Sequence, residues 1–95
     1  MRHAGKAALG SLEPVLAVLR EQGALVERTP GSFYFRSKAF IHFHEDPLGL
    51  FADLKEDFVS FSRYRVSTRT EQRALIARIK NCLCATSAKK SATAK

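Results

Sequence analysis

The sequence lacks long apolar runs and contains little cysteine. Its apolar stretches are short and interrupted by charged residues, so none approaches the roughly 20 apolar residues that a membrane-spanning helix needs. Residues 1–10 also lack the apolar segment of a secretory signal. Cys82 and Cys84 alone cannot build a disulfide framework. Together these absences predict a cytoplasmic protein with no membrane partner.

Motifs for covalent catalysis and for nucleotide binding are missing as well. The five glycines are scattered along the chain and match neither a P-loop nor a dinucleotide-binding fingerprint, so we expect no cofactor. No serine lies in the Gly-x-Ser-x-Gly pattern of a nucleophile elbow. The sequence therefore favours a non-enzymatic protein, and we predict no catalytic residue.

What the sequence does contain is enough apolar material for one folded core. It has 95 residues, of which 45% are hydrophobic and seven are Phe, and a chain of this length closes a single core. We predict one α+β domain over residues 11–83, a flexible N-terminus over residues 1–10 and a disordered basic tail over residues 84–95. The tail has no large apolar residue after Cys84 and cannot offset the entropy lost on ordering it.

Apolar periodicity predicts a helix near each end of this domain. The segment 11–22 repeats Leu and Val at helical spacing, with Ser11 as the expected N-cap. Thr68-Arg69-Thr70-Glu71 matches a capping box that starts a second helix. An apolar stripe follows it along one helix face: Leu75, Ile76, Ile79, Cys82 and Leu83.

Strand patterns fill the sequence between the helices. We predict strands over residues 24–28, 33–36, 39–44, 50–54 and 61–67 from their aromatic, β-branched and alternating composition. Ser37-Lys38 is the expected hairpin turn. The predicted fold class is α+β, with an antiparallel sheet of four to five strands in a meander, flanked by an N-terminal and a C-terminal helix packed on one face.

Two histidines form the most suggestive chemical pattern. In a strand, His42 and His44 project from the same face at a spacing suited to two ligands of one metal ion, and Asp53 on the next strand is a candidate third ligand. The alternation of these histidines with Ile41 and Phe43 is also that of a strand with one half-exposed face, which needs no ligand. The alternative function is therefore a small metal-binding protein or a metal-dependent enzyme that uses these three residues, and both interpretations of the pattern stay open at this level.

Positive charge points to a second class of ligand. The formal net charge is +7, but residues 11–83 hold eleven Lys or Arg against nine Asp or Glu. Seven basic residues form the candidate contact with nucleic acid or with an acidic partner: Arg63, Arg65, Arg69, Arg73, Lys80, Lys89 and Lys90. A solvated helix face, locally paired with the acidic residues of segment 45–57, explains the same charges without a ligand.

Aromatic residues are interleaved with basic ones in two places. Phe33-Tyr34-Phe35-Arg36 and Arg63-Tyr64-Arg65 are compatible with stacking of bases on a sheet. An RNP-type consensus is absent, and most Phe residues of so short a chain must lie in the core. A third hypothesis is a homodimer or another protein-interaction domain that pairs through an exposed strand edge.

One stretch of the chain has a family resemblance. Residues 36–55, RSKAFIHFHEDPLGLFADLK, resemble a segment of short, uncharacterised bacterial proteins. The resemblance covers roughly residues 30–82, which agrees with the predicted domain limits. It implies no activity, so the hypotheses of function rest on the residues alone.

Overall fold

The computed structural model describes residues 2–94 of the chain and the side chains of residues 2–84. Its elements follow in the order β1 (Arg2–His3), α1 (Lys6–Ser11), α2 (Glu13–Glu21), β2 (Leu25–Thr29), β3 (Ser32–Phe35), β4 (Lys38–Asp46), β5 (Gly49–Leu54), β6 (Ser62–Arg65) and α3 (Arg69–Ala94). The predicted α+β class is confirmed. Among residues 2–94, no helix is both long and apolar enough to cross a membrane.

The sheet is an antiparallel meander in the order β2-β3-β4-β5-β6. The short strand β1 lies outside this path and pairs with the end of β4, with Arg2 opposite Glu45. Between β3 and β4 the register shifts so that Phe40 is an extra residue on β4, the arrangement of a β-bulge. Strands β2 and β6 are left as the two edges of the meander; homodimer formation through them stays a prediction.

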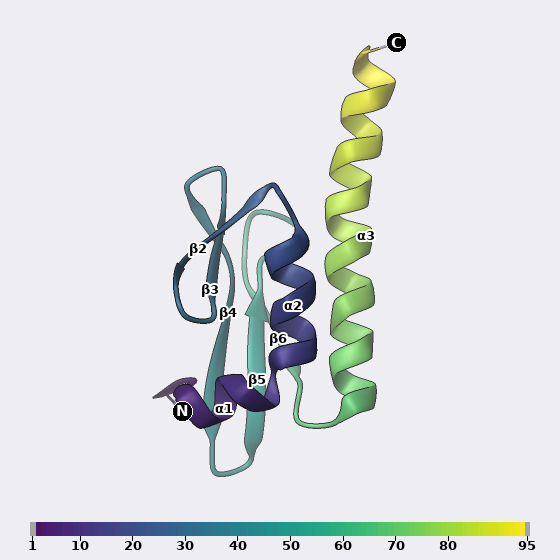
Figure 1. The fold of residues 1–95 in the computed structure, drawn as a ribbon. Helices are drawn as coiled ribbons and strands as arrows, with labels where there is room; N and C mark the ends of the chain where they lie inside the picture. The colour runs from purple at the N-terminus through teal and green to yellow at the C-terminus, as the bar shows by residue number, and fades with distance from the viewer. Residues whose placement is uncertain (1, 95) are drawn as a thin grey trace.

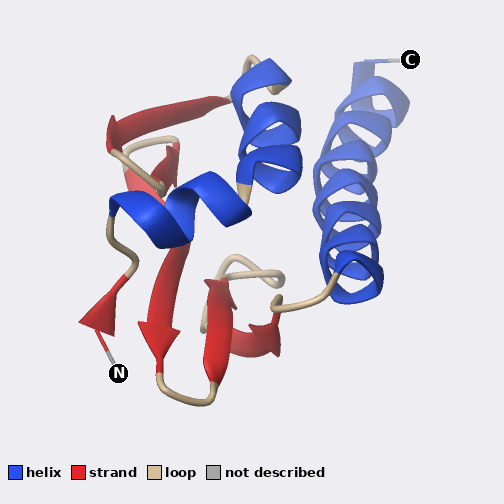
Figure 2. Cartoon of the chain, turned by 60° about the horizontal axis from the view of Figure 1, so that its bottom comes forward, coloured by secondary structure: helices blue, strands red, loops and turns tan. Residues whose placement is uncertain are grey.

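Both long helices pack on one face of the sheet, as the sequence predicts. Figures 1 and 2 show α2 and α3 side by side on that face, and the two helices are in contact. The buried side of the sheet carries Ile41 and Phe43 of β4 with Ala52 and Leu54 of β5. The helices complete the core with fully buried residues on their facing sides: Val15, Leu16, Leu19, Leu75 and Ile79. We call the side of the sheet that the helices cover its inner face.

The N-terminus differs from the sequence prediction. Residues 1–10 are predicted to be flexible, but β1 and α1 occupy Arg2–His3 and Lys6–Ser11, and Ala4 lies in the core with 2% exposure. Glu45 holds this segment, because its carboxylate accepts hydrogen bonds from the Arg2 side chain and from the Gly5 amide. The order of this segment thus depends on a partner some forty positions away, which local composition cannot reveal.

The predicted helix over residues 11–22 begins later than expected. Ser11 ends α1 instead of capping α2, and Leu12 is the N-cap of α2 with no side-chain hydrogen bond. Leu12 is itself fully buried, so packing at this corner takes the place of a polar cap. Pro14 lies in the first turn of α2, where its missing N–H removes no helical hydrogen bond.

The hairpin between β3 and β4 turns one residue earlier than predicted. Arg36 and Ser37, with φ of 52° and 69°, are the two residues between the strands, and positive φ at both positions is the geometry of a type I′ turn. That turn matches the twist of the flanking strands, and it is adopted here without the Asn or Gly that usually marks it.

The start of α3 confirms the predicted capping box. The Glu71 amide donates to Oγ1 of Thr68 at 3.1 Å, and the Glu71 carboxylate accepts from the Thr68 amide at 2.9 Å. The helix then continues to Ala94 and extends beyond the sheet (Figure 1). It therefore enters the segment 84–95 for which disorder is predicted. Side chains after Cys84 lie outside the described residues, and the disorder of this tail stays a prediction.

Candidate functional site on the outer face of the sheet

The face of the sheet opposite the helices carries polar residues of the strands, together with a few of their aromatic residues. Because side chains alternate along a strand, burial of Ile41, Phe43, Ala52 and Leu54 directs their neighbours to this second face. Cross-strand partners share a face, so the register identifies the members: His42 and His44 of β4, Phe51 and Asp53 of β5, Arg63 and Arg65 of β6, and Tyr34 of β3. We call this the outer face.

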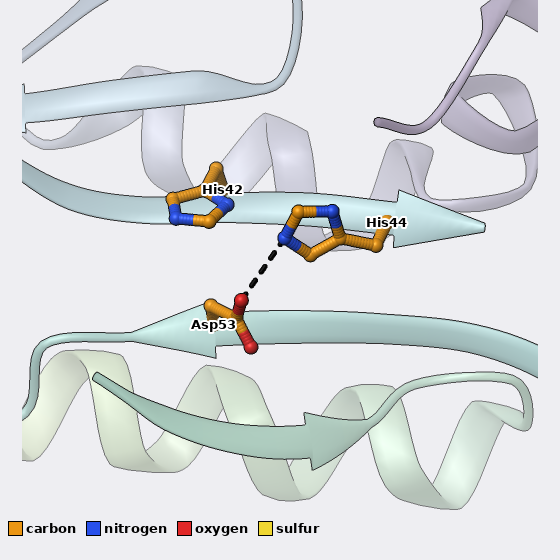
Figure 3. A group of neighbouring side chains, drawn as sticks. All are labelled: His42, His44 and Asp53. Carbon is orange, nitrogen blue, oxygen red and sulfur yellow. Dashed lines mark hydrogen bonds and ion pairs between the residues drawn. The ribbon is translucent and has the colours of Figure 1, made fainter. Parts of the chain in front are cut away.

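The structure brings His42, His44 and Asp53 together (Figure 3). Asp53 is the register partner of His42, and its Oδ2 lies 3.0 Å from Nε2 of His44. The two imidazole rings meet edge to face with 4.7 Å between their centroids. One ligand atom from each of the three residues lies within 4.8 Å of the other two. The juxtaposition expected from the sequence is therefore present in the fold.

Arg63 is a fourth member of this cluster. Its Nε donates to Oδ1 of Asp53 at 2.8 Å and its Nη2 donates to Oδ2 at 3.0 Å. This two-pronged pairing lowers the pKa of Asp53, against the opposing effect of burial. Asp53 is only 8% exposed, so the guanidinium keeps a nearly buried carboxylate ionised.

The environment of His42 favours the neutral imidazole. Burial lowers the pKa of His42 because it disfavours the charged form, and the positive charge available to His44 lowers the pKa further. Asp53 acts in the opposite direction. A neutral ring keeps a nitrogen lone pair, which is the form that binds metal ions.

His3 is a residue of this face that sequence reasoning missed. It is the register partner of His44 on β1, and its Nε2 lies 3.1 Å from the carbonyl oxygen of Pro30. Thus all three histidines of the chain gather on one face. No spacing rule could have found His3, because it joins the others only through the pairing of a two-residue strand.

Aromatic rings on the outer face each lie beside a cation. The Arg28 guanidinium lies 4.6 Å from the ring centroid of Tyr34, and Arg65 lies 5.7 Å from that of Phe51. Phe61, which precedes β6, has the Lys55 ammonium 4.8 Å from its centroid and packs edge-on to His42. These distances are those of cation–π contacts.

The two aromatic–basic runs of the sequence divide between the faces. From the first run only Tyr34 points outward, since Phe33 is buried in the core and Phe35 contacts Phe40 and Phe58. From the second run Tyr64 points to the helices, where its hydroxyl donates to the Glu56 carboxylate and Arg78 lies over its ring. The outward aromatic set is therefore smaller than the sequence pattern, and Phe51 and Phe61 complete it.

The predicted basic set is also divided. Arg63 and Arg65 lie on the outer face, where Arg63 pairs with Asp53 and Arg65 lies 3.6 Å from Glu71. Arg69, Arg73 and Lys80 are exposed on α3, the helix that packs on the inner face. The side chains of Lys89 and Lys90 lie outside the described residues. The predicted basic set is thus distributed over two layers of the fold, the sheet and the helix layer.

Comparisons with protein-family models, with curated proteins and with solved structures found no match. The resemblance of residues 36–55 to short bacterial proteins stays a prediction. The candidate site therefore rests on the chemistry and geometry of the outer face.

Proposed function

We propose that the protein is a non-enzymatic module that binds single-stranded nucleic acid on the outer face of its sheet. The observation that carries this proposal is the arrangement of Tyr34, Phe51 and Phe61, three aromatic side chains on a face without a covering helix, each with a cation beside its ring. Modules that bind single strands combine such stacking rings with a basic groove for the backbone.

The dimensions of the sheet support this proposal. Tyr34 on β3 and Phe51 on β5 pair with Ala39 and His44 of β4, so they lie two strands apart and about five residues apart along the strands, roughly 18 Å in all. The Phe61 ring packs on His42, between these two positions. A row of rings of this length suits an extended single strand with unstacked bases, the form that RNA-binding four-stranded sheets also recognise. Arg28, Lys55 and Arg65 lie next to the rings and are placed to meet phosphate groups.

An acidic protein partner is the competing ligand, because the same cations would attract carboxylates. The two ligands differ in their need for rings: bases stack on aromatic faces, whereas carboxylates require only positive charge. Substitutions that remove a ring and keep the charge therefore separate the two.

The test measures binding of fluorescently labelled single-stranded RNA and DNA by anisotropy across a series of salt concentrations. We expect Tyr34→Ala and Phe61→Ala each to weaken binding, because one stacked base contributes about 1–3 kcal/mol, or roughly 5- to 150-fold in affinity. Affinity of the unmodified protein should fall steeply with salt. Arg69→Ala combined with Arg73→Ala, on α3 and not on the sheet, is the matched control and should change affinity far less.

Two results would contradict the proposal. One is an absence of measurable binding to either nucleic acid at low salt. The other is binding that the α3 double variant abolishes and the two ring variants leave intact, which would move the contact to the helix and favour a purely electrostatic partner.

A further inference from the structure

We propose that His42, His44 and Asp53 bind one divalent transition-metal ion, of which Zn²⁺ is the type. This inference goes beyond the proposed function, since it uses a different set of side chains and needs no nucleic acid. Two imidazoles and one carboxylate are a donor set that Zn²⁺ accepts with a coordination position left for water. The three residues come from adjacent antiparallel strands, so their backbone positions are fixed by the sheet.

The distances are close to those of a metal site. Zn–N and Zn–O bonds are about 2.0–2.2 Å long, which in tetrahedral geometry separates two ligand atoms by roughly 3.4 Å. The His44 Nε2 and Asp53 Oδ2 atoms are 3.0 Å apart, and the widest separation among the three ligand atoms is within 4.8 Å. Rotation of one imidazole ring about its side-chain bonds is enough to close the difference.

The ligands are also held in place before an ion arrives. His44 is hydrogen-bonded to Asp53, and His42 lies between His44 and Phe61, with ring centroids 4.7 and 4.8 Å away. His42 and His44 are both half-buried and Asp53 is buried. Side chains restrained in this way lose little further freedom on binding, which favours affinity.

Arg63 is the group that opposes the ion. Its guanidinium bonds to both oxygens of Asp53 and brings a positive charge to the site. The bond from Nε to Oδ1 can persist while Oδ2 turns to the metal, since a hydrogen bond to the second oxygen orients a ligating carboxylate. The bond from Nη2 to Oδ2 has to break. The Arg63 side chain is 53% exposed, so its end group has access to water when that bond is lost.

This competition gives a test that loss of folding cannot imitate. Arg63→Gln removes the opposing charge and should tighten Zn²⁺ binding by about 10-fold, the size expected for one unit charge about 6 Å from a divalent ion at high dielectric. His42→Ala and His44→Ala each remove one ligand and should weaken binding by at least about 10-fold, the lower end of the loss that even outer-shell changes cause. The predicted changes thus have opposite signs within one site.

The experiment uses the 95-residue chain with the substitution Cys84→Ser. This substitution is needed because Cys84 is exposed and thiolates bind Zn²⁺ on their own. The protein is treated with a chelator and dialysed, then titrated with ZnCl₂ by calorimetry and with CoCl₂ by visible absorption, which reports the coordination geometry. His3→Gln is the matched control. His3 lies on the same face but is directed to the Pro30 carbonyl oxygen, so its loss should leave the affinity unchanged.

The expected result is one ion per chain, bound more tightly by the Arg63 variant and more weakly by the His42 and His44 variants. The proposal is overturned if no ion binds to the Cys84→Ser chain. It is also overturned if His3→Gln weakens binding as much as His42→Ala does, or if Arg63→Gln leaves the affinity unchanged or weaker. Circular dichroism of each variant confirms that it is folded before it is compared.

Discussion

The two faces of the sheet differ in composition although they are built from alternate residues of the same strands. On the inner face, Ile41 and Phe43 of β4 are at most 1% exposed and lie beneath the helices. On the outer face, the alternate residues His42 and His44 are half-buried, and their neighbours are an ion pair and aromatic rings. The apolar core therefore lies on one face of the sheet, and the imidazole and charged side chains of these strands lie on the other. A shift of register by a single residue would exchange the two.

The sharpest test of this division compares neighbouring residues on β4. Phe43→Ala should reduce the free energy of unfolding by about 3–5 kcal/mol, because it removes a fully buried ring and leaves a cavity. His42→Ala, one position away, should cost about 1 kcal/mol or less, since it lies on the face without helices. Urea unfolding followed by circular dichroism measures both.

Similar losses of stability in Phe43→Ala and His42→Ala would contradict this division between the two faces. A cost near 3 kcal/mol for His42→Ala would mean that the outer face is itself a packed surface, covered by something other than solvent. Ile41→Val removes a single methylene from the inner face and is the control for cavity size; it should cost about 0.5–1.5 kcal/mol, well below Phe43→Ala.

Much of the inner face could be predicted from the sequence. Apolar periodicity located the stripe on α3, the alternation of β4 and β5 gave the sides of their residues, and the capping box at Thr68 and Glu71 is present with both of its hydrogen bonds. These signals are local: each depends on residues within a turn or two of one another, and packing then reinforces what local geometry already favours.

The parts that sequence reasoning missed depend on pairing between distant segments. β1 is two residues long and has no period to detect; it is held by Glu45, 43 positions after Arg2. The bond between Arg63 and Asp53 follows from the register of β5 and β6, which no composition rule supplies. Charge alone groups the basic residues of α3 with those of β6, but the fold places them in different layers, the helix layer and the sheet.

Asp53 shares features of both faces. Its side chain belongs to the outer face, but the residue is only 8% exposed, as inner-face residues are. Asp53→Ala leaves Arg63 without its acceptor and removes the hydrogen bond to His44. We expect a loss of about 1–2 kcal/mol, at the lower part of the range for hydrogen bonds to charged groups because Arg63 can turn to water. Unfolding is measured in the presence of a chelator, so that metal binding does not contribute.

A double-mutant cycle with Arg63→Ala isolates the pair. Because the two residues are in direct contact, the double variant should lose about 0.5–1 kcal/mol less than the sum of the single losses. Strict additivity would show that the buried position of Asp53 is maintained by packing and not by its ion pair, which would place Asp53 with the inner-face residues in energetic terms.

Glu27 is the converse exception, a charged residue on the inner side of β2. It is the register partner of buried Phe33, and its carboxylate accepts bonds from Nε and Nη2 of Arg20 on α2 at 2.8 and 3.1 Å and from the Gly31 amide at 3.1 Å. The bonds from Arg20 are the main reason why the pKa of Glu27 is lowered. This carboxylate therefore ties the helix layer to the edge of the sheet in its ionised form.

The lowered pKa of Glu27 determines how its contribution to stability changes with pH. A carboxyl group whose pKa is lower in the folded protein stabilises the fold above its unfolded pKa, about 4.3 for Glu, and loses this effect as the pH falls through its folded pKa. Glu27→Gln should thus cost about 0.5–1 kcal/mol at pH 7. The difference from the unmodified protein should begin to shrink as the pH falls below about 5. Glu21→Gln, at the exposed end of α2, is the control for loss of a carboxylate that does not bridge the helix layer to the sheet. The test is the urea midpoint of unfolding, measured at each pH for the unmodified protein and the two variants. If the midpoints of Glu27→Gln and Glu21→Gln depend on pH in the same way, apolar contacts alone hold α2 against β2.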